Sequence, residues 1–464
     1  MSNLLSRRAL LTTMASGAAL AAANGDAAAQ QAPGGMPAGG AQTLEADVCV
    51  VGGGSGGVGA ALAAARMGAD VVLVEKNQML GGTSTCAWVH TWEPSRGCRG
   101  IPQDVWKVMK EDPAASLAED YEASLQRVGG VWLPWEPWGF QWAVTRLLEE
   151  TGKCRVLYNA TFFDVEMDGG RIESVLCTFA GGLVKVRAPI VIDCTADGNV
   201  CVAAGCDYRI GEDPKSAFDE PNAPDEPTLS LNSLTLLYRI TDTGEKQTPF
   251  APAEAPKCPR SAALRTCGNG DILVNAVNMI PGNAVLHADL SRILALGVRL
   301  VYDHFRWMQT EDTRRDFSTW TIAGVAPEIG VRETRRIVGE YTLTEHDCQA
   351  GVKNQQHEDI IAITDHAVDI HGPKHKLYEV PNGAYGVPYR CLLAKGTENL
   401  LIACRGASFS HIAASSCRLS RAMMTLGQAA GTAAAVCARD KTPLRAIDVP
   451  ALRQALTGQG VELA

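Results

Sequence analysis

The chain has 464 residues, of which 46% are hydrophobic and 20% are charged, and this is the composition of an ordinary globular protein. Its formal net charge of -9 argues against a protein that binds nucleic acid by electrostatic attraction, so we expect no nucleic-acid partner. A chain of this length can hold two or three average domains, or one large α/β unit with an inserted lobe.

The N-terminal segment predicts export. Arg7 and Arg8 precede an apolar run rich in Ala and Thr, and "AAAQ" offers an A-x-A-like cleavage site near Ala29. The paired arginines resemble a twin-arginine export signal, so we expect a signal peptide at 1–29 and a Pro/Gly/Ala linker at 30–44. The apolar run is too short to span a membrane. We therefore expect a periplasmic or otherwise exported protein without stable membrane insertion; a cytoplasmic protein that merely begins with two arginines is the alternative.

The segment 46–76 carries the pattern of a dinucleotide-binding unit. A buried strand, "DVCVV", leads to Gly52, Gly54 and Gly57 at G-x-G-x-x-G spacing, and a small-residue helix and a second apolar strand follow. The glycines permit a tight turn and close approach of the backbone to a pyrophosphate, whose charge the helix N-terminus favours. Glu75 ends the second strand, where a carboxylate can accept hydrogen bonds from the adenosine ribose.

The chain after Glu75 favours FAD over NAD. A plain nicotinamide-binding domain would usually turn into another helix here, whereas "EKNQMLGGTS" continues to Gly81 and Gly82. This continuation resembles flavoproteins with the glutathione-reductase-like FAD fold, in which the glycine pair lets the backbone pass close to the extended FAD. The resemblance therefore implies FAD as the cofactor.

A second segment, 188–206, agrees with this interpretation. It predicts a strand, then Thr195, Asp197 and Gly198, then a small-residue helix. The pattern resembles the D-x-T-G-D-G segment of the same flavoproteins, with Ala196 where a glycine is commoner.

The middle of the chain predicts strands first and a lobe afterwards. Residues 155–188 read as alternating strands joined at "DGG" and "AGG" turns, which is a β-meander. Residues 211–227 are a Pro/acid-rich loop, and residues 228–390 are expected to form the substrate lobe, with a helix near 289–312. The segment 365–376 holds three histidines without a convincing metal-ligand spacing, so we expect a surface loop and no metal; the histidines are His366, His371 and His375.

The C-terminal part supplies one more strand and helix. "NLLIAC" predicts a strand, "RGASFSHIAASSCR" a polar turn, and "AMMTLGQAAGTAAAVCA" a helix whose small residues permit close approach. The N-terminus of this helix would stabilise negative charge on a reduced flavin. A tightly packed core helix explains the same residues, and both can hold.

These segments together resemble the FAD-dependent oxidoreductase family, related more distantly to fumarate reductase and ketosteroid dehydrogenase flavoproteins. The resemblance rests on "GGTSTCAWVHTWEP", "GVRETRRIVGEYTLTEHD", "VPYRCLLAKGTENLLIA" and "SHIAASSCRLSRAMMTLGQAAGTAAA". It implies an α/β fold, namely a Rossmann-like FAD-binding domain of the glutathione-reductase type with a β-meander and an inserted α+β substrate lobe. The FAD-binding domain would comprise 45–210 and 391–464, and the substrate lobe 211–390. Cys404, where a glycine is usual, and His90, where we would expect Asn, depart from the family pattern.

Two absences indicate where the electrons come from. The chain has no second G-x-G-x-x-G unit and no C-x-x-x-x-C redox pair after the first one. A dedicated NAD(P)H domain is therefore not expected, and the pattern favours a dehydrogenase or oxidase that takes a hydride directly from substrate.

The fifteen cysteines are scattered, with no C-x-x-C motif, so a haem or an iron–sulfur centre is not supported. Most are expected to be small core residues. A disulfide between Cys258 and Cys267, or between Cys86 and Cys98, stays open.

His411 is the first candidate for the catalytic base, because it lies in the predicted polar turn where the chain should pass the flavin. Arg418 could bind the flavin O2 or a substrate carboxylate, and Tyr389 and Arg390 could line the same cleft. Arg332 and Arg335 could do so too, although the run that they form with Arg336 is more often an ion-pairing helix face.

The segment "LGGTSTCAWVHTWEPSRG" (80–97) is expected to face both cofactor and substrate. The related fold implies that residues 81–85 contact FAD and that His90, Trp92 and Glu93 form one wall of the substrate cleft, with His90 a further catalytic candidate. Cys86 or His90 could even bond covalently to the flavin, as a histidine does in some relatives. A tryptophan wall suits a sugar ring or a flat apolar molecule.

The complete set of residues expected to contact FAD combines the glycine-rich loop, the acid, the glycine pair and the two later segments. It consists of Gly52, Gly54, Ser55, Gly56, Gly57, Glu75, Lys76, Gly81, Gly82, Thr83, Ser84, Thr195, Asp197, Gly198, Ser416 and Gly427.

The leading functional hypothesis is an exported FAD enzyme that oxidises a small organic substrate (an alcohol or sugar, an amine or a C–C bond). Its electrons would pass to a quinone, a cytochrome or oxygen. A fumarate-reductase-like alkene reductase, a flavin-containing lyase or isomerase without net redox, and a non-catalytic binding protein are the alternatives.

Overall fold

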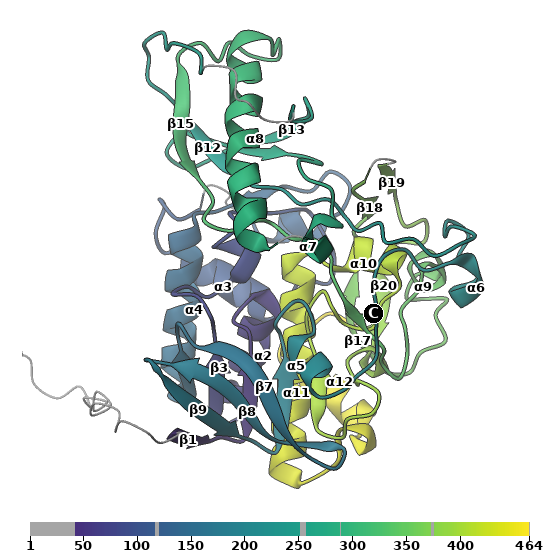
Figure 1. The fold of residues 1–464 in the computed structure, drawn as a ribbon. Coiled ribbons are helices and arrows are strands. Elements are labelled where there is room, and N and C mark those ends of the chain that lie inside the picture. The colour runs from purple at the N-terminus through teal and green to yellow at the C-terminus, as the bar shows by residue number, and fades with distance from the viewer. Residues whose placement is uncertain (1–41, 117–119, 251–256, 288, 373–374, 464) are drawn as a thin grey trace, which may run out of the picture. The chain divides into compact units, whose positions relative to one another are not determined.

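The computed structural model describes residues 42–116, 120–250, 257–287, 289–372 and 375–463. Residues 41–464 form one compact unit, which mixes helices and strands (Figure 1). The predicted signal peptide and nearly all of the predicted linker lie outside the described residues, so both stay predictions. The domain boundaries proposed within the rest of the chain stay predictions as well.

A five-stranded parallel sheet carries the glycine-rich loop. Its strands are short, apolar and buried, which is the pattern of a parallel sheet covered on both faces. The order is β21 (Leu400–Ile402), β10 (Ile190–Asp193), β2 (Val48–Val51), β3 (Val71–Val74) and β6 (Cys154–Leu157). The sheet combines strands from the N-terminal half of the chain with one strand from the C-terminal part, which pairs with β10.

Two helices, α2 (Ser55–Arg66) and α11 (Ser420–Asp440), pack against each other beside this sheet (Figure 1). A Cβ atom on Gly427 would lie 1.9 Å from the carbonyl oxygen of Gly56, so the close approach requires glycine there. The prediction of a closely packed small-residue helix near the C-terminus is thus confirmed. The other helices near α2 are α3 (Ile101–Met109), α4 (Pro137–Thr151) and α5 (Asn199–Ala203).

The predicted meander forms a second sheet. Strands β7 (Thr161–Asp168), β8 (Arg171–Phe179) and β9 (Gly182–Arg187) pair antiparallel in sequence, and β1 (Gln42–Glu45) joins β9 in parallel. Gly169 and Gly181 lie in the two turns with positive φ, a conformation that glycine adopts at little cost. The turn predictions at "DGG" and "AGG" are confirmed.

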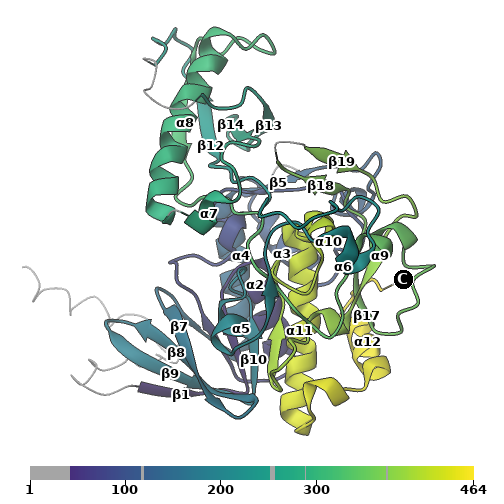
Figure 2. The same ribbon diagram turned by 45° about the vertical axis from the view of Figure 1, so that its right-hand side comes forward.

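A third sheet and a long helix form a lobe at one end of the unit (Figures 1 and 2). The antiparallel order is β13 (Ala262–Thr266), β14 (Ile272–Ala276), β12 (Tyr238–Asp242) and β15 (Trp320–Val325). Helix α8 (Leu290–Thr310) is the helix predicted near 289–312, and it buries Val301 and Phe305 against the sheet core. A short helix, α7 (Ala284–His287), precedes it.

The remainder of the predicted substrate lobe packs elsewhere. Strands β17 (Ile360–Thr364) and β18 (Val368–Ile370) contact the C-terminal helices α11 and α10 (His411–Cys417). The other described elements are β4 (Thr91–Trp92), β5 (Leu133–Pro134), β11 (Tyr208–Arg209), α6 (Lys215–Phe218), β16 (Arg336–Ile337), α9 (Glu345–Ala350), β19 (Lys376–Tyr378), β20 (Tyr385–Pro388) and α12 (Val449–Gly458).

Three local predictions were wrong. The predicted polar turn after β21 contains helix α10, because the Ser410 side chain caps it by accepting a hydrogen bond from the N–H of Ala413. The predicted surface loop at 365–376 contains β18, and both His366 and His371 are buried. No helix holds the run of arginines: Arg336 belongs to strand β16.

All fifteen cysteines are free, so neither of the two disulfides that stayed open forms. Fourteen are buried and Cys154 is partly buried, which agrees with their predicted role as small core residues. Among the described residues, no helix combines the length and the apolar character that a membrane span requires.

Candidate functional site

Three glycines of the glycine-rich loop are required by the protein's own packing. A Cβ on Gly52 would lie 2.4 Å from the carbonyl oxygen of Cys194, and φ at Gly52 is +98°. On Gly56 it would lie 2.0 Å from the oxygen of Ala403, and on Gly57 1.8 Å from that of Gly52. The loop therefore sits tightly between the ends of β10 and β21.

Gly54 is different. No protein atom lies within 4 Å of the position that its Cβ would take, and its φ of -67° suits any residue. Gly54 nevertheless lines two neighbouring cavities, so a side chain there would enter their shared space. The packing of the protein does not explain this glycine, whereas a phosphate group that approaches the backbone at the N-terminus of α2 does.

The first of these cavities, which we call the Glu75 cavity, has a volume of about 500 Å³. Glu75 is buried and accepts hydrogen bonds from the N–H groups of Gly53 (2.6 Å) and Asn77 (2.8 Å). Burial raises the pKa of Glu75, and these two hydrogen bonds oppose the rise. A carboxylate held in this way keeps lone pairs that can accept hydrogen bonds from ribose hydroxyls.

Other predicted cofactor residues line the Glu75 cavity. Lys76 forms an ion pair with Glu328, and both side chains face the cavity. Asp197 accepts hydrogen bonds from Thr334 and Arg405, each at 2.6 Å. The predicted residues along this wall are Gly52, Gly54, Glu75, Lys76, Gly82, Thr83, Thr195 and Asp197.

The second cavity, which we call the arginine cavity, has a volume of about 330 Å³. It shares Gly54, Gly82 and Thr83 with the Glu75 cavity, so the two spaces meet at the glycine-rich loop. Ser55, Gly56 and Cys404 line the arginine cavity only. The combined space passes the loop on both sides of Gly54 and suits an extended dinucleotide whose pyrophosphate would lie there.

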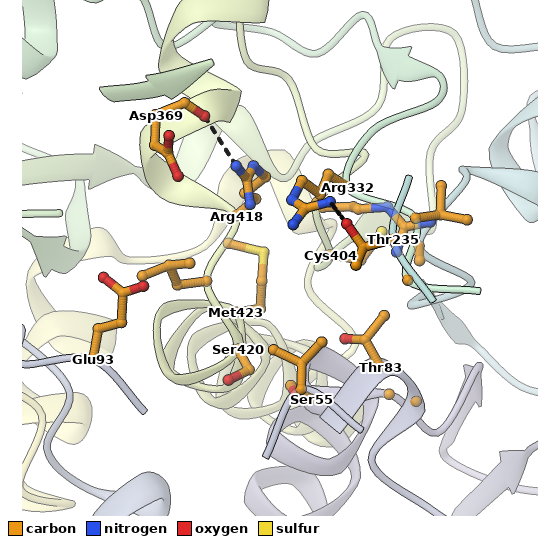
Figure 3. Close-up of a pocket in the computed structure, with 18 of the residues that line it drawn as sticks. Ser55, Thr83, Glu93, Thr235, Arg332, Asp369, Cys404, Arg418, Ser420 and Met423 are labelled. Carbon is orange, nitrogen blue, oxygen red and sulfur yellow. Dashed lines mark hydrogen bonds between the residues drawn. The ribbon is translucent and has the colours of Figure 1, made fainter. Parts of the chain in front are cut away.

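Two arginines point into the arginine cavity from different parts of the chain (Figure 3). Arg332 donates hydrogen bonds to the Ser233 carbonyl (2.7 Å) and the Thr235 hydroxyl (2.8 Å). Arg418 donates to the carbonyl of Asp369 (3.0 Å). Burial and the charge of Arg418 lower the pKa of Arg332 to about 9, and burial also lowers the pKa of Arg418.

Two histidine–carboxylate pairs line the same cavity. Nε2 of His366 lies 2.9 Å from Oε2 of Glu93, and Nε2 of His371 lies 2.6 Å from Oδ2 of Asp369. Within the described part of the chain, Nδ1 of each ring is buried without a hydrogen-bond partner. Burial lowers the pKa of His371 to about 4, and the two arginines add to this effect.

Asp369, His371 and His375 place one donor atom each within 4.8 Å of one another, and these donor types can hold a divalent cation. The positive charges of Arg332 and Arg418, which act on His371, oppose a cation there. We therefore assign no metal to this group.

His411 does not line either cavity, contrary to its predicted place beside the flavin. Helix α10 directs its ring into a buried network, where Nδ1 lies 2.9 Å from Oε1 of Glu333. Glu333 also pairs with Arg336 and accepts a hydrogen bond from Asn232 (2.8 Å). Burial by itself would raise the pKa of Glu333, but the charges of His411 and Arg336 outweigh this effect and lower the pKa to about 2.

Of the three residues predicted to form one wall of the substrate cleft, only one lines a cavity. Glu93 lines the arginine cavity, whereas His90 and Trp92 are buried elsewhere, in an aromatic cluster with Trp135. Burial lowers the pKa of His90 to about 4. Neither Cys86 nor His90 lines either cavity.

Tyr389 and Arg390 also lie away from both cavities. The Tyr389 hydroxyl is buried and donates to the Leu444 carbonyl, because the short helical turn at 389–391 directs it inward. Arg390 pairs with Asp359 instead of facing a cleft.

Six residues that we predicted as FAD contacts serve the protein's own structure. Ser416 donates to the carbonyl of His366 (2.5 Å), and Ser84 pairs with Ser55 (3.3 Å). The other four permit tight turns or close packing, and they are Gly57, Gly81, Gly198 and Gly427.

Sequence reasoning named Glu93, Arg332 and Arg418 as candidates for this cleft, but it missed Asp369, His366 and His371. Asp369 and His371 are two positions apart on the edge of strand β18, so they can share one face while Val368 and Ile370 are buried on the other. This alternation was the available signal in a segment that we expected to be a surface loop. Arg332 was expected as one candidate for the cleft, with an ion-pairing run as the alternative.

Comparison with known proteins identifies the family to which the chain belongs. A family model described as FAD dependent oxidoreductase matches residues 47–456. No curated protein matches the chain. Among solved structures, a geranylgeranyl bacteriochlorophyll reductase-like protein from Thermoplasma acidophilum is 14% identical, with 90% of this chain and 83% of that chain covered and a TM-score of 0.47.

Two further structures are enzymes by their names. The flavin-dependent brominase Bmp2 is 14% identical, with coverages of 89% and 83% and a TM-score of 0.47. The p-nitrophenol 4-monooxygenase PnpA from Pseudomonas putida DLL-E4 is 13% identical, with coverages of 65% and 70% and a TM-score of 0.40. None of these likenesses bears on the substrate of this chain. The family match spans nearly all of the described residues, and the cavities meet at a glycine that only a bound group explains, so the chain belongs to the FAD-dependent oxidoreductase family and its cofactor is FAD.

Proposed function

We propose that the protein is an exported FAD-dependent dehydrogenase or oxidase that takes a hydride from a small organic substrate (an alcohol or sugar, an amine or a C–C bond). The observation that carries this proposal is the arginine cavity, where two histidine–carboxylate pairs open onto a space continuous with the glycine-rich loop. FAD supplies the hydride acceptor when it is bound. A quinone, a cytochrome or oxygen would then receive the electrons.

We further propose that the FAD-binding part is of the glutathione-reductase type. Its support is the parallel sheet assembled from both chain ends, together with the meander that follows β6. The continuation from Glu75 to Gly81 and Gly82 is consistent with this type.

In this proposal His371 removes the proton that accompanies hydride loss from an OH or NH group. When Nε2 donates its hydrogen to Asp369, the lone pair lies on Nδ1, which has no partner in the described part of the protein. With a pKa of about 4, the ring is neutral at pH 7 and able to accept a proton. The charged or titratable groups around it are Asp369, His375, Arg332 and Arg418.

The second pair, His366 and Glu93, would position the substrate. The Ser416 hydroxyl holds the backbone of His366, and Arg421 donates to the backbone carbonyl of Glu93. Both residues are therefore fixed from helices α10 and α11, which is how a rigid binding wall is built.

Replacing His371 with asparagine should lower kcat about 100- to 1000-fold while the FAD content stays unchanged, because a positioned base contributes on this order. The measurement is steady reduction of a redox dye by a panel of alcohols, amines and hydroxy acids. In the unmodified enzyme, kcat/KM should be flat from pH 8 to pH 6 and fall as the pH drops towards about 4, since protonation removes the base.

The exposed His346, replaced with asparagine in the same way, is the matched control and should keep full activity. Wild-type turnover in the His371→Asn enzyme would remove His371 from this role. Substrate conversion without dye reduction would instead favour a lyase or isomerase, and activity only with a reduced dye and an alkene would favour the reductase.

Export through the twin-arginine pathway is proposed from the sequence of the N-terminus alone. Replacing both Arg7 and Arg8 with lysine should retain the precursor in the cytoplasm, because the pathway reads the arginine pair. Cell fractionation and the N-terminus of the mature protein, expected near Gln30, are the measurements. An unprocessed chain in the cytoplasm of unmodified cells would contradict the proposal.

A further inference from the structure

Arg332 and Arg418, two of the three arginines that line the arginine cavity, have no acidic partner among the described residues, whereas the third, Arg405, pairs with Asp197. Neither Arg332 nor Arg418 forms an ion pair there, and each donates only to neutral oxygens. Nε of Arg418 is buried without any hydrogen-bond partner in the described structure. The nearest carboxylate, that of Asp369, is already bonded to His371 and His375.

Two guanidinium groups that have no negatively charged partner in this setting raise the free energy of the protein. Each side chain is partly buried and lines the cavity (Figure 3). Charges removed from water need a partner with good hydrogen-bond geometry. Arginine's planar fork matches a carboxylate, which it can bind with two parallel hydrogen bonds.

The two carboxylates in the cavity wall, those of Glu93 and Asp369, are each already paired with a histidine. Glu93 is held by His366, and the neutral polar groups include Thr235 and Asn275. Apolar side chains complete the wall, namely Val89, Leu237, Val277, Val331, Leu419 and Met423. A ligand that fits has one anionic end and an apolar or hydroxyl-bearing body.

We propose that Arg332 and Arg418 bind the carboxylate of the substrate, so that the enzyme acts on a small organic acid whose reacting carbon lies beside His371. This inference rests on the proposed function, because it names the substrate class of the same cavity. The anionic pyrimidine end of a reduced flavin has similar chemistry and is the other source of negative charge that the test must separate.

The test is calorimetric titration of the FAD-loaded enzyme with benzoate and 2-hydroxybutyrate, and with benzamide and 2-hydroxybutanamide as neutral counterparts. The acids should bind at least tenfold more tightly than the amides. Replacing either Arg332 or Arg418 with methionine should weaken acid binding about 10- to 100-fold, the range expected for a charged hydrogen bond. Arg335, from the same run, contacts Asn199 and lines neither cavity, so Arg335→Met is the matched control.

Equal affinity for acids and amides in the unmodified enzyme would overturn the inference whether or not the variants fold. Unchanged acid binding in both methionine variants would overturn it too. If the variants lost only the formation of a sulfite adduct with the bound flavin, which reports positive charge near the cofactor, the arginines would serve FAD instead. Dye reduction by neutral substrates alone would leave the proposed function intact while the substrate class failed.

Discussion

Gly54→Val should leave the protein folded but with at least tenfold less bound FAD than the unmodified chain. The valine side chain would enter the space where the two cavities meet, which no protein atom fills within 4 Å of the Cβ position. The φ of -67° permits valine, so the backbone itself is not strained. Gly54→Ala, which adds one methyl group, should have a smaller effect. The measurement is the flavin absorbance per mole of purified protein.

Gly458→Val is the control, because Gly458 is exposed at the end of α12 and also has open space around its Cβ position. It should keep its full flavin content. The thermal midpoint of each variant, measured without added FAD, separates loss of binding from loss of folding. A Gly54→Val protein that retains stoichiometric FAD would show that the phosphates do not pass this glycine.

Arg336→Met should lower the free energy of unfolding by about 3–5 kcal/mol, the cost of removing one partner from a buried ion-pair network. The Arg336 side chain is 1% exposed and pairs with Asp213 (2.9 Å) and Glu333. Without it, the two buried carboxylates each lose a positive partner. Urea unfolding followed by far-UV circular dichroism is the measurement.

The same substitution should also weaken catalysis, because the network reaches the arginine cavity. Asn232 donates to Glu333 and accepts a hydrogen bond from the backbone N–H of His371 (2.8 Å). Arg66→Met, which removes an exposed partner of Asp104, should cost less than about 1 kcal/mol. Similar urea midpoints for the two variants would mean that the buried network contributes little.

The cofactor side of the site could be predicted from the sequence because its parts are contiguous. The strand, glycine-rich loop, helix, second strand and Glu75 all lie within residues 46–76, and local rules of strand and helix formation bring them together. The loop glycines were chosen correctly as a group. Their reasons differ, however: Gly52 and Gly57 make room for protein atoms, and only Gly54 leaves room for a ligand.

The substrate side could not be predicted in the same way. Glu93 lies more than two hundred residues before Arg332, and Arg332 lies more than eighty residues before Arg418, yet all three line one cavity. Nothing in the sequence around any of them indicates that it meets the other two. His366 and His371 were assigned to a surface loop because the histidines of this segment have no convincing metal-ligand spacing. Pairing of β18 with β19 and packing of β18 against α10 bury them instead.

His411 shows how small the deciding feature can be. Its place between the last strand and the last helix was predicted correctly, but the seven-residue helix α10 turns the ring towards Glu333 and away from the cavity. The sequence by itself determined the cofactor, the sheet and the glycine-rich loop, since each depends on neighbours along the chain. Only the tertiary structure decided which histidines and arginines meet, because that choice depends on side-chain direction and on contacts between distant segments.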